Sequence, residues 1–314
     1  MDGINVFETG ASIHAESRTV DSRVRAPREP VYARSMGMLC KLQRILPGLV
    51  LLLVLAPLCA VSAPAQSFSA AHAKVSLVAE SNAVVPGHVL WLGVVFDLEK
   101  GWHTYWVNPG DSGEAPKIQW ELPPGFRAGT IRWPVPARLG SATIIDYGYE
   151  GHVLLAVPLQ VPAGYAPGKP LSLSAQVRYL ACSDVCIPAQ AHPTLTIPSA
   201  TSNATAEAQK EFTEARSRWP LPMPAGWKVQ ARDAGDHFIL SVETGMHESQ
   251  ASFFPLQDAI DNSAQQMVTP TEHGMEITLK KSDLQTKPIP AIQGVLVLAS
   301  NRAVQISAPV VPAR

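Results

Sequence analysis

Short apolar runs separated by proline- and glycine-rich turns dominate the chain after residue 72. The first group of runs occupies residues 73–80, 88–98, 142–149, 152–161 and 171–182. The sequences VPG, NPGDSG, LPPG and APGK lie between these runs and are typical of turns. The chain also contains 28 prolines, and proline disfavours the interior of a helix or of a central strand. This pattern predicts an antiparallel β-sandwich.

One helix is expected, at residues 203–218. Four apolar residues recur there at helical spacing, namely Ala208, Phe212, Ala215 and Trp219. Ser202 or Asn203 is a suitable N-cap, and Pro220 follows the expected end of the helix. We interpret this helix as a connector between two domains.

Further strand-like runs follow the helix, and they contain no cysteine and no cluster of ionisable residues. We therefore expect a second, smaller β domain with a packing or docking role. The predicted chain is all-β, with a leader over residues 1–65, a first domain over 66–200, a helical connector over 201–219 and a second domain over 220–314.

Residues 38–66 carry the pattern of a secretory signal peptide, in which basic residues precede an apolar run and small residues follow it. The apolar run is far shorter than the roughly 20 residues of a membrane-spanning helix. Cleavage is expected after Ala63 or Ala65. Because a polar stretch precedes this pattern, we expect translation to start at Met36 or Met38, the alternative being an N-terminal extension.

Charge argues against two classes of partner. Without residues 1–65 the chain carries 18 Lys+Arg and 21 Asp+Glu, which gives a net charge of about −3. Such a balance provides no electrostatic footprint for nucleic acid or for an anionic membrane. We expect a soluble protein that is exported to the periplasm and does not bind nucleic acid.

Two of the four cysteines, Cys40 and Cys59, lie in the expected leader, which leaves Cys182 and Cys186 in the sequence YLACSDVCIP. An exported protein reaches a compartment in which disulfides persist. Four residues of extended strand span roughly 13 Å, at about 3.3 Å per residue. A disulfide requires Cα atoms about 4.4–6.8 Å apart. The pair therefore closes only if residues 183–185 turn tightly, and serine and aspartate favour such a turn.

A disulfide of this kind stabilises a fold only weakly. Closing five residues contributes only about 2 kcal/mol, against about 3 kcal/mol for fifteen, and the bridge joins neither two sheets nor two domains. Tight, exposed disulfides tend to be the labile or catalytic ones. These arguments favour a redox pair but leave an inert disulfide and a metal site open. Cu(I) selects thiolates, and His103, His152 and His192 are the further ligands considered, although their spacing matches no metal motif.

Other motifs carry less information. The aromatic run GWHTYW at residues 101–106 is expected to pack within the sandwich. The sequence contains no G-x-S-x-G nucleophile elbow and no glycine-rich phosphate loop. We therefore expect no cofactor, no bound metal and no small-molecule substrate.

Four blocks in order resemble the N-terminal periplasmic domain of the DsbD/ScsB family of thiol–disulfide interchange proteins. They are GWHTYWVNPGDSGEAPKIQWELPPGF (101–126), IRWPVPARL (131–139), DYGYEGHVLLAVPL (146–159) and VRYLACSDVCIPAQA (177–191). Four ordered blocks are far more specific than a lone C-x3-C pair. The resemblance is greatest to the ScsB-like branch, in which a second β region also follows.

The resemblance implies an immunoglobulin-like fold in which Cys182 and Cys186 form a redox pair. Cys186 would form the mixed disulfide with a partner, and Asp146, Tyr147 and Tyr149 would belong to a cap that shields the disulfide. The implied partners are a thioredoxin-like electron donor and a periplasmic disulfide oxidoreductase as client. The implied activity is that of a protein-disulfide reductase acting as a stoichiometric relay, and the family also suggests a link to cytochrome c biogenesis.

Two features depart from the family pattern. The better-known DsbD members have a longer spacing between the two cysteines. The sequence also contains no C-x-x-C motif and no membrane segment after residue 65, so we expect a separate membrane electron carrier. Two alternatives of other classes are a copper-binding or copper-tolerance protein that uses the same thiols, and a non-catalytic interaction module.

Overall fold

A computed structural model describes residues 68–141, 143–166, 169–197 and 206–312. The expected leader and the expected N-cap, Ser202 or Asn203, lie outside these residues. The described residues belong to one compact unit. Within the described residues, no helix is long and apolar enough to cross a membrane.

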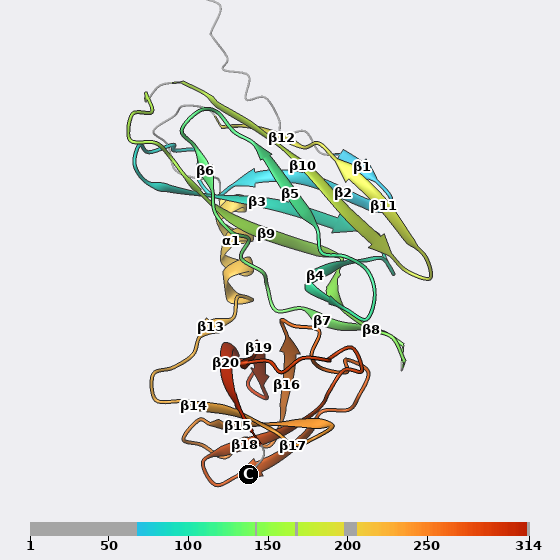
Figure 1. The fold of residues 1–314 in the computed structure, drawn as a ribbon. Coiled ribbons are helices and arrows are strands. Elements are labelled where there is room, and N and C mark those ends of the chain that lie inside the picture. Colours follow the sequence, from blue (N-terminus) through green and yellow to red (C-terminus); the bar gives the residue numbers. More distant parts are fainter. Residues whose placement is uncertain (1–67, 142, 167–168, 198–205, 313–314) are drawn as a thin grey trace, which may run out of the picture. The chain divides into compact units, whose positions relative to one another are not determined.

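Two antiparallel sheets form the first β region (Figure 1). One has the strand order β1-β2-β3-β9-β6, and the other has the order β11-β10-β4-β8-β7, with β5 and β12 also paired to β10. The bounds are β1 (Phe68–Ala70), β2 (Ala73–Ala79), β3 (Val89–Leu98), β4 (His103–Gly110), β5 (Lys117–Glu121), β6 (Arg127–Ala128), β7 (Ala137–Gly140), β8 (Ile145–Glu150), β9 (His152–Gln160), β10 (Leu171–Cys182), β11 (Cys186–Ala191) and β12 (Thr194–Ile197). The predicted immunoglobulin-like antiparallel sandwich is confirmed.

Alternation along β10 shows how the sequence forms this core. Leu173, Ala175, Val177 and Tyr179 are buried, whereas Arg178 is exposed on the opposite face. Successive side chains of a strand point to opposite faces, so every second residue of this run enters the core. Burying each large apolar side chain contributes about 1.5–3 kcal/mol.

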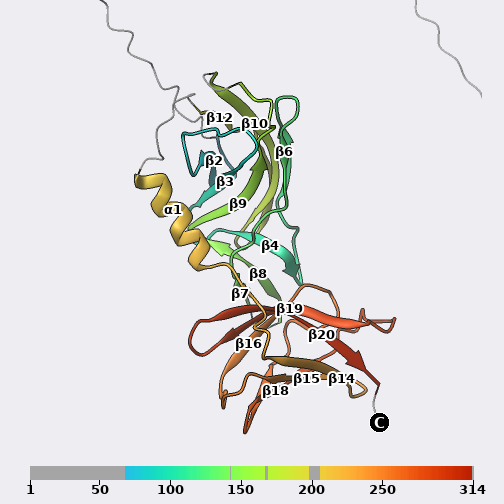
Figure 2. The ribbon, with the colours of Figure 1, turned by 90° about the vertical axis from the view of Figure 1, so that its left-hand side faces the viewer.

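Helix α1 (Ala206–Ser217) lies within the range predicted for it, and it also covers the outer side of a sheet beside β9 (Figure 2). Phe212 is fully buried there, in a cluster with Val95 and Leu154. One turn later, Arg216 donates two hydrogen bonds to the carboxylate of Glu80, at 2.5 and 2.7 Å. The helix is therefore a packed part of the first β region as well as a connector.

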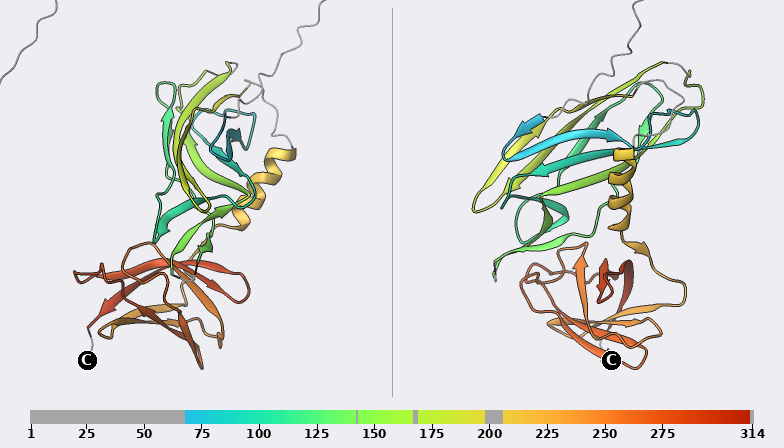
Figure 3. Two further views of the ribbon diagram at one scale, coloured as in Figure 1. Left: turned by 90° about the vertical axis from the view of Figure 1, so that its right-hand side faces the viewer. Right: turned by 180° about the vertical axis from the view of Figure 1, so that it is seen from behind.

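The second β region has its own core and is shown from two further sides in Figure 3. Its strands are β13 (Leu221–Pro222), β14 (Lys228–Asp233), β15 (His237–Glu243), β16 (Ala251–Pro255), β17 (Met267–Thr271), β18 (Gly274–Lys280), β19 (Ala291–Leu298) and β20 (Ala303–Val311). They follow the order β16-β19-β20-β14-β15-β18-β17, and β20 pairs in parallel with both β13 and β14. Phe254, Val295 and Ala303 belong instead to the core of the first region, so the two regions are packed together.

Candidate functional site

Cys182 and Cys186 form a disulfide at the turn end of a β-hairpin. Cys182 is the last residue of β10, Cys186 is the first of β11, and the two are direct partners in the antiparallel register. The three residues between them turn tightly, because the amide of Ser183 donates to the carbonyl of Val185 at 3.0 Å. This geometry brings the two Cα atoms to 4.1 Å. The predicted tight turn over residues 183–185 is thus observed.

The two cysteines differ in exposure. Cys182 is buried, with 1% of its surface exposed, and it lies beside β4, where it pairs with His103. Cys186 is exposed, as is Val185 at the tip of the turn. An attacking thiolate must reach a sulfur along the S–S axis, so access favours attack at Cys186, with Cys182 as the leaving sulfur.

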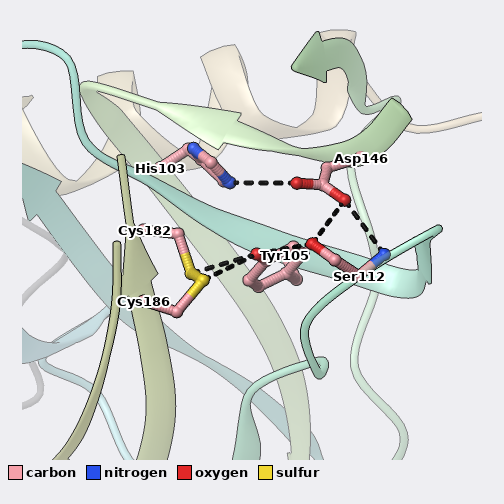
Figure 4. The surroundings of a disulfide bond; sticks show 6 residues. All are labelled: His103, Tyr105, Ser112, Asp146, Cys182 and Cys186. Carbon is pink, nitrogen blue, oxygen red and sulfur yellow. Dashed lines mark hydrogen bonds and ion pairs between the residues drawn. A yellow bond between two sulfur atoms is a disulfide. The ribbon is translucent and has the colours of Figure 1, made fainter. Parts of the chain in front are cut away.

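Tyr105 contacts both sulfur atoms from β4 (Figure 4). Its hydroxyl donates to Sγ of Cys182 at 3.0 Å and lies 3.4 Å from Sγ of Cys186. Burial raises the pKa of Tyr105 above its ordinary value, so the hydroxyl keeps its proton and remains a donor. A donor at this position stabilises negative charge that develops on the buried sulfur.

A tight turn supports Tyr105 from the other side. Ser112 lies 3.5 Å from the Tyr105 hydroxyl, and its own amide and hydroxyl donate to Asp146 Oδ1 at 3.1 and 2.8 Å. Gly113, with φ +79°, packs so closely on the Tyr105 ring that a Cβ there would lie 2.1 Å from Cζ. This contact sets the distance between the turn and the Tyr105 ring.

His103 lies on the same strand, two residues before Tyr105, and the two rings are in edge contact at 5.2 Å. Burial lowers the pKa of His103, an effect that the carboxylate of Asp146 partly opposes. Nε2 of His103 is 3.7 Å from Asp146 Oδ2, which is longer than a hydrogen bond. His103 is therefore a neutral ring at neutral pH rather than half of an ion pair.

The three residues expected to cap the disulfide separate into two groups. Asp146 joins the polar network through Ser112. Tyr147 instead packs against Phe254 at a ring distance of 5.4 Å, and Tyr149 donates to the carbonyl of Pro134 at 2.8 Å. Both tyrosines are core residues, on the face of β8 opposite Asp146, so direct contact with the disulfide falls to Tyr105.

The sequence did not identify Tyr105 as a site residue. Its only signal was membership of the aromatic run at residues 101–106, which we expected to pack within the sandwich. Trp106, its neighbour, does lie in the core. Only the pairing of β4 beside the end of β10, where Cys182 faces His103, distinguishes Tyr105 from its neighbours.

The histidines considered for copper are dispersed. His152 lies 2.7 Å from Asp97, and His192 lies 2.9 Å from Gln190. Across the described residues, no group of three or more His, Cys, Asp or Glu side chains is arranged to hold a metal ion.

Comparisons with known proteins gave a family model and several structures to which this chain is similar. Residues 74–198 match the family model described as the N-terminal domain of the thiol:disulfide interchange protein DsbD. The N-terminal periplasmic domain of ScsB from Proteus mirabilis aligns with a TM-score of 0.58 and 19% identity, over 77% of this chain and 97% of that one. The periplasmic chaperone SfaE aligns with a TM-score of 0.19 and 10% identity, over 76% of this chain and all of that one. Comparison with curated proteins gave no match.

The first β region is thus a sandwich of immunoglobulin-like fold with a disulfide at the turn end of one hairpin, and it matches the DsbD N-terminal family model. More particularly, the match covers residues 74–198, so the resemblance seen in the sequence is confirmed over this segment.

Proposed function

We propose that this protein relays electrons in the periplasm through the Cys182–Cys186 pair, from a thioredoxin-like donor to a client disulfide oxidoreductase. The domain of residues 66–200 would carry the chemistry, and the domain of residues 220–314 would follow it through the connector 201–219. The observation that supports this proposal best is the asymmetric disulfide, with one exposed cysteine and one buried cysteine that accepts a hydrogen bond from Tyr105.

Reduction of the pair proceeds in two exchanges. A donor thiolate attacks Sγ of Cys186, the S–S bond breaks, and its electron pair leaves on Cys182 as a thiolate that the Tyr105 hydroxyl stabilises. A second donor thiolate then attacks the donor sulfur of the mixed disulfide. The donor leaves as a disulfide, and both cysteines of this protein are reduced after taking up two protons from solvent.

The reduced pair passes its electrons on by the same chemistry in reverse. The Cys186 thiolate attacks the client disulfide and forms a mixed disulfide. Cys182 then attacks Cys186, which restores the internal bond and releases the client with two thiols. Each cycle transfers two electrons and consumes no small substrate, so the protein acts as a relay. A separate membrane carrier would supply the donor, and a link to cytochrome c biogenesis rests on the family resemblance alone.

The decisive experiment is the reduction potential of the pair, measured on the purified protein equilibrated against glutathione and dithiothreitol. A value between about −120 and −270 mV, the range of known exchange proteins, supports the relay. A value below about −300 mV, typical of structural disulfides, overturns it.

A further inference from the structure

Asn262 connects the second β region to the turn beside the disulfide. It lies between β16 and β17, and only 7% of its surface is exposed. Its Nδ2 donates to Asp111 Oδ1 at 2.9 Å. Because a carboxylate accepts hydrogen bonds and an amide oxygen cannot donate one, the orientation of this amide is fixed by Asp111.

The segment around Asn262 is itself held rigidly. The neighbouring Asp261 accepts hydrogen bonds from the amides of Ser263 and Ala264 and from Nζ of Lys280, at 2.7–3.1 Å. Arg138, on β7 of the first region, donates to the carbonyl of Asn262 at 2.5 Å. These hydrogen bonds therefore hold the backbone that positions the Asn262 side chain against Asp111.

Asp111 links Asn262 to the turn at residues 111–113. Its Oδ2 accepts the amide of Ile145, and its own amide donates to the carbonyl of Ile145, both at 2.8 Å. The next two residues are Ser112 and Gly113, the two that contact Tyr105. A displacement of Asp111 therefore moves the support of the residue that holds the sulfurs.

We propose that Asn262 is a positioning residue for disulfide exchange, acting through Asp111 and the 111–113 turn to keep the Tyr105 hydroxyl on Cys182. This inference rests on the proposed function and gives the second β region a part in it beyond packing. When the Asn262–Asp111 contact opens, Tyr105 loses its fixed position and the leaving thiolate of Cys182 loses its donor. The second region then sets the reactivity of a disulfide to which it contributes no atom.

A swap of the two side chains tests this directly. Asn262→Asp places two carboxylates opposite each other, and Asp111→Asn combined with Asn262→Asp restores an amide–carboxylate pair with the roles exchanged. We expect the single variant to be reduced by dithiothreitol roughly threefold to tenfold more slowly than the wild type, which is the effect of a typical hydrogen bond when the donor is displaced rather than removed. The double variant should recover the wild-type rate. Gln257→Ala, which loses two hydrogen bonds within the second region, is the matched control and should leave the rate unchanged.

The route through Tyr105 is tested by a double-mutant cycle, since residues that act through one another are non-additive. In a Tyr105→Phe background, Asn262→Asp should slow reduction no further. An unchanged rate in folded Asn262→Asp protein overturns the proposal, and so does an equal slowing with and without the Tyr105 hydroxyl. Neither outcome depends on the reduction potential of the wild-type protein. That potential separately tests the proposed relay function.

Discussion

The hydroxyl of Tyr105 donates to the buried sulfur of Cys182 across 3.0 Å, between residues 77 positions apart in the sequence. The same hydroxyl is 3.4 Å from Cys186, so the donor lies closer to the buried sulfur than to the exposed one. In the proposed relay this asymmetry makes Cys186 the sulfur that is attacked and Cys182 the sulfur that leaves.

Tyr105→Phe removes the donor and keeps the ring. Because a hydrogen bond to a charged acceptor contributes about 1.5–3 kcal/mol, the reduced form loses stabilisation and the reduction potential becomes more negative. About 30 mV corresponds to 1.4 kcal/mol in this two-electron couple, so we expect a shift of roughly 30–60 mV. Equilibration against glutathione measures it, and an unchanged potential would show that the hydroxyl does not act on the thiolate.

Gly113→Ala tests the support of Tyr105, since the added Cβ would lie 2.1 Å from Cζ of that ring. We expect slower reduction by dithiothreitol in addition to a loss of stability. Gly87→Ala is the matched control, because Gly87 has a similar φ of +76° and no atom within 4 Å of its virtual Cβ. Both variants should lose about 1–2 kcal/mol from left-handed backbone strain. Equal reduction rates in the two variants would contradict a role for the turn.

Each cysteine can be examined alone. Cys182→Ser leaves the exposed Cys186 free, whereas Cys186→Ser leaves the buried Cys182 free. We expect an alkylating reagent to label Cys186 at least about tenfold faster, since thiol reactivity follows access as well as thiolate character. Stable mixed disulfides with partners should form only with Cys182→Ser. Faster labelling of Cys182 would reverse the assigned roles.

His103 makes stability depend on pH. Burial lowers its pKa in the folded protein, so between that pKa and the ordinary value of about 6.5 the unfolded chain binds more protons than the folded one. The free energy of unfolding therefore falls as the pH drops below about 6.5, by up to about 1.4 kcal/mol for every pH unit between the two pKa values. Urea unfolding at several pH values should show this slope, and His103→Gln should flatten it. If His103→Gln keeps the slope of the wild type, the dependence on pH arises elsewhere.

Phe212→Ala tests whether helix α1 is part of the packed fold. Phe212 is fully buried against Val95 and Leu154, and its truncation should cost about 3–5 kcal/mol of stability. Lys210→Ala, on the exposed side of the helix, should change stability by no more than about 0.5 kcal/mol. Thermal unfolding distinguishes the two, and equal midpoints would mean that the helix only links the regions.

Local sequence determined much of this protein. The period of two along residues 171–182 fixed which side chains of β10 enter the core, and the serine and aspartate between the cysteines fixed a turn that only neighbouring residues need to form. The helix followed from four apolar residues at helical spacing. Each of these features depends on contacts or periodicities within a few residues, which the sequence displays directly.

Only the tertiary structure decided what surrounds the disulfide. Between Tyr105 and Gly110 the pairing of β4 with β8 shifts register, and no local sequence pattern predicts this shift. The turn that contacts Tyr105 follows directly after it. Alternation along β8 then sends Asp146 toward that turn and Tyr147 into the core. The contact between Asn262 and Asp111 joins residues 151 positions apart. Such contacts depend on how separate strands and regions pack together, because a strand's own periodicity specifies two faces but not what each face will meet.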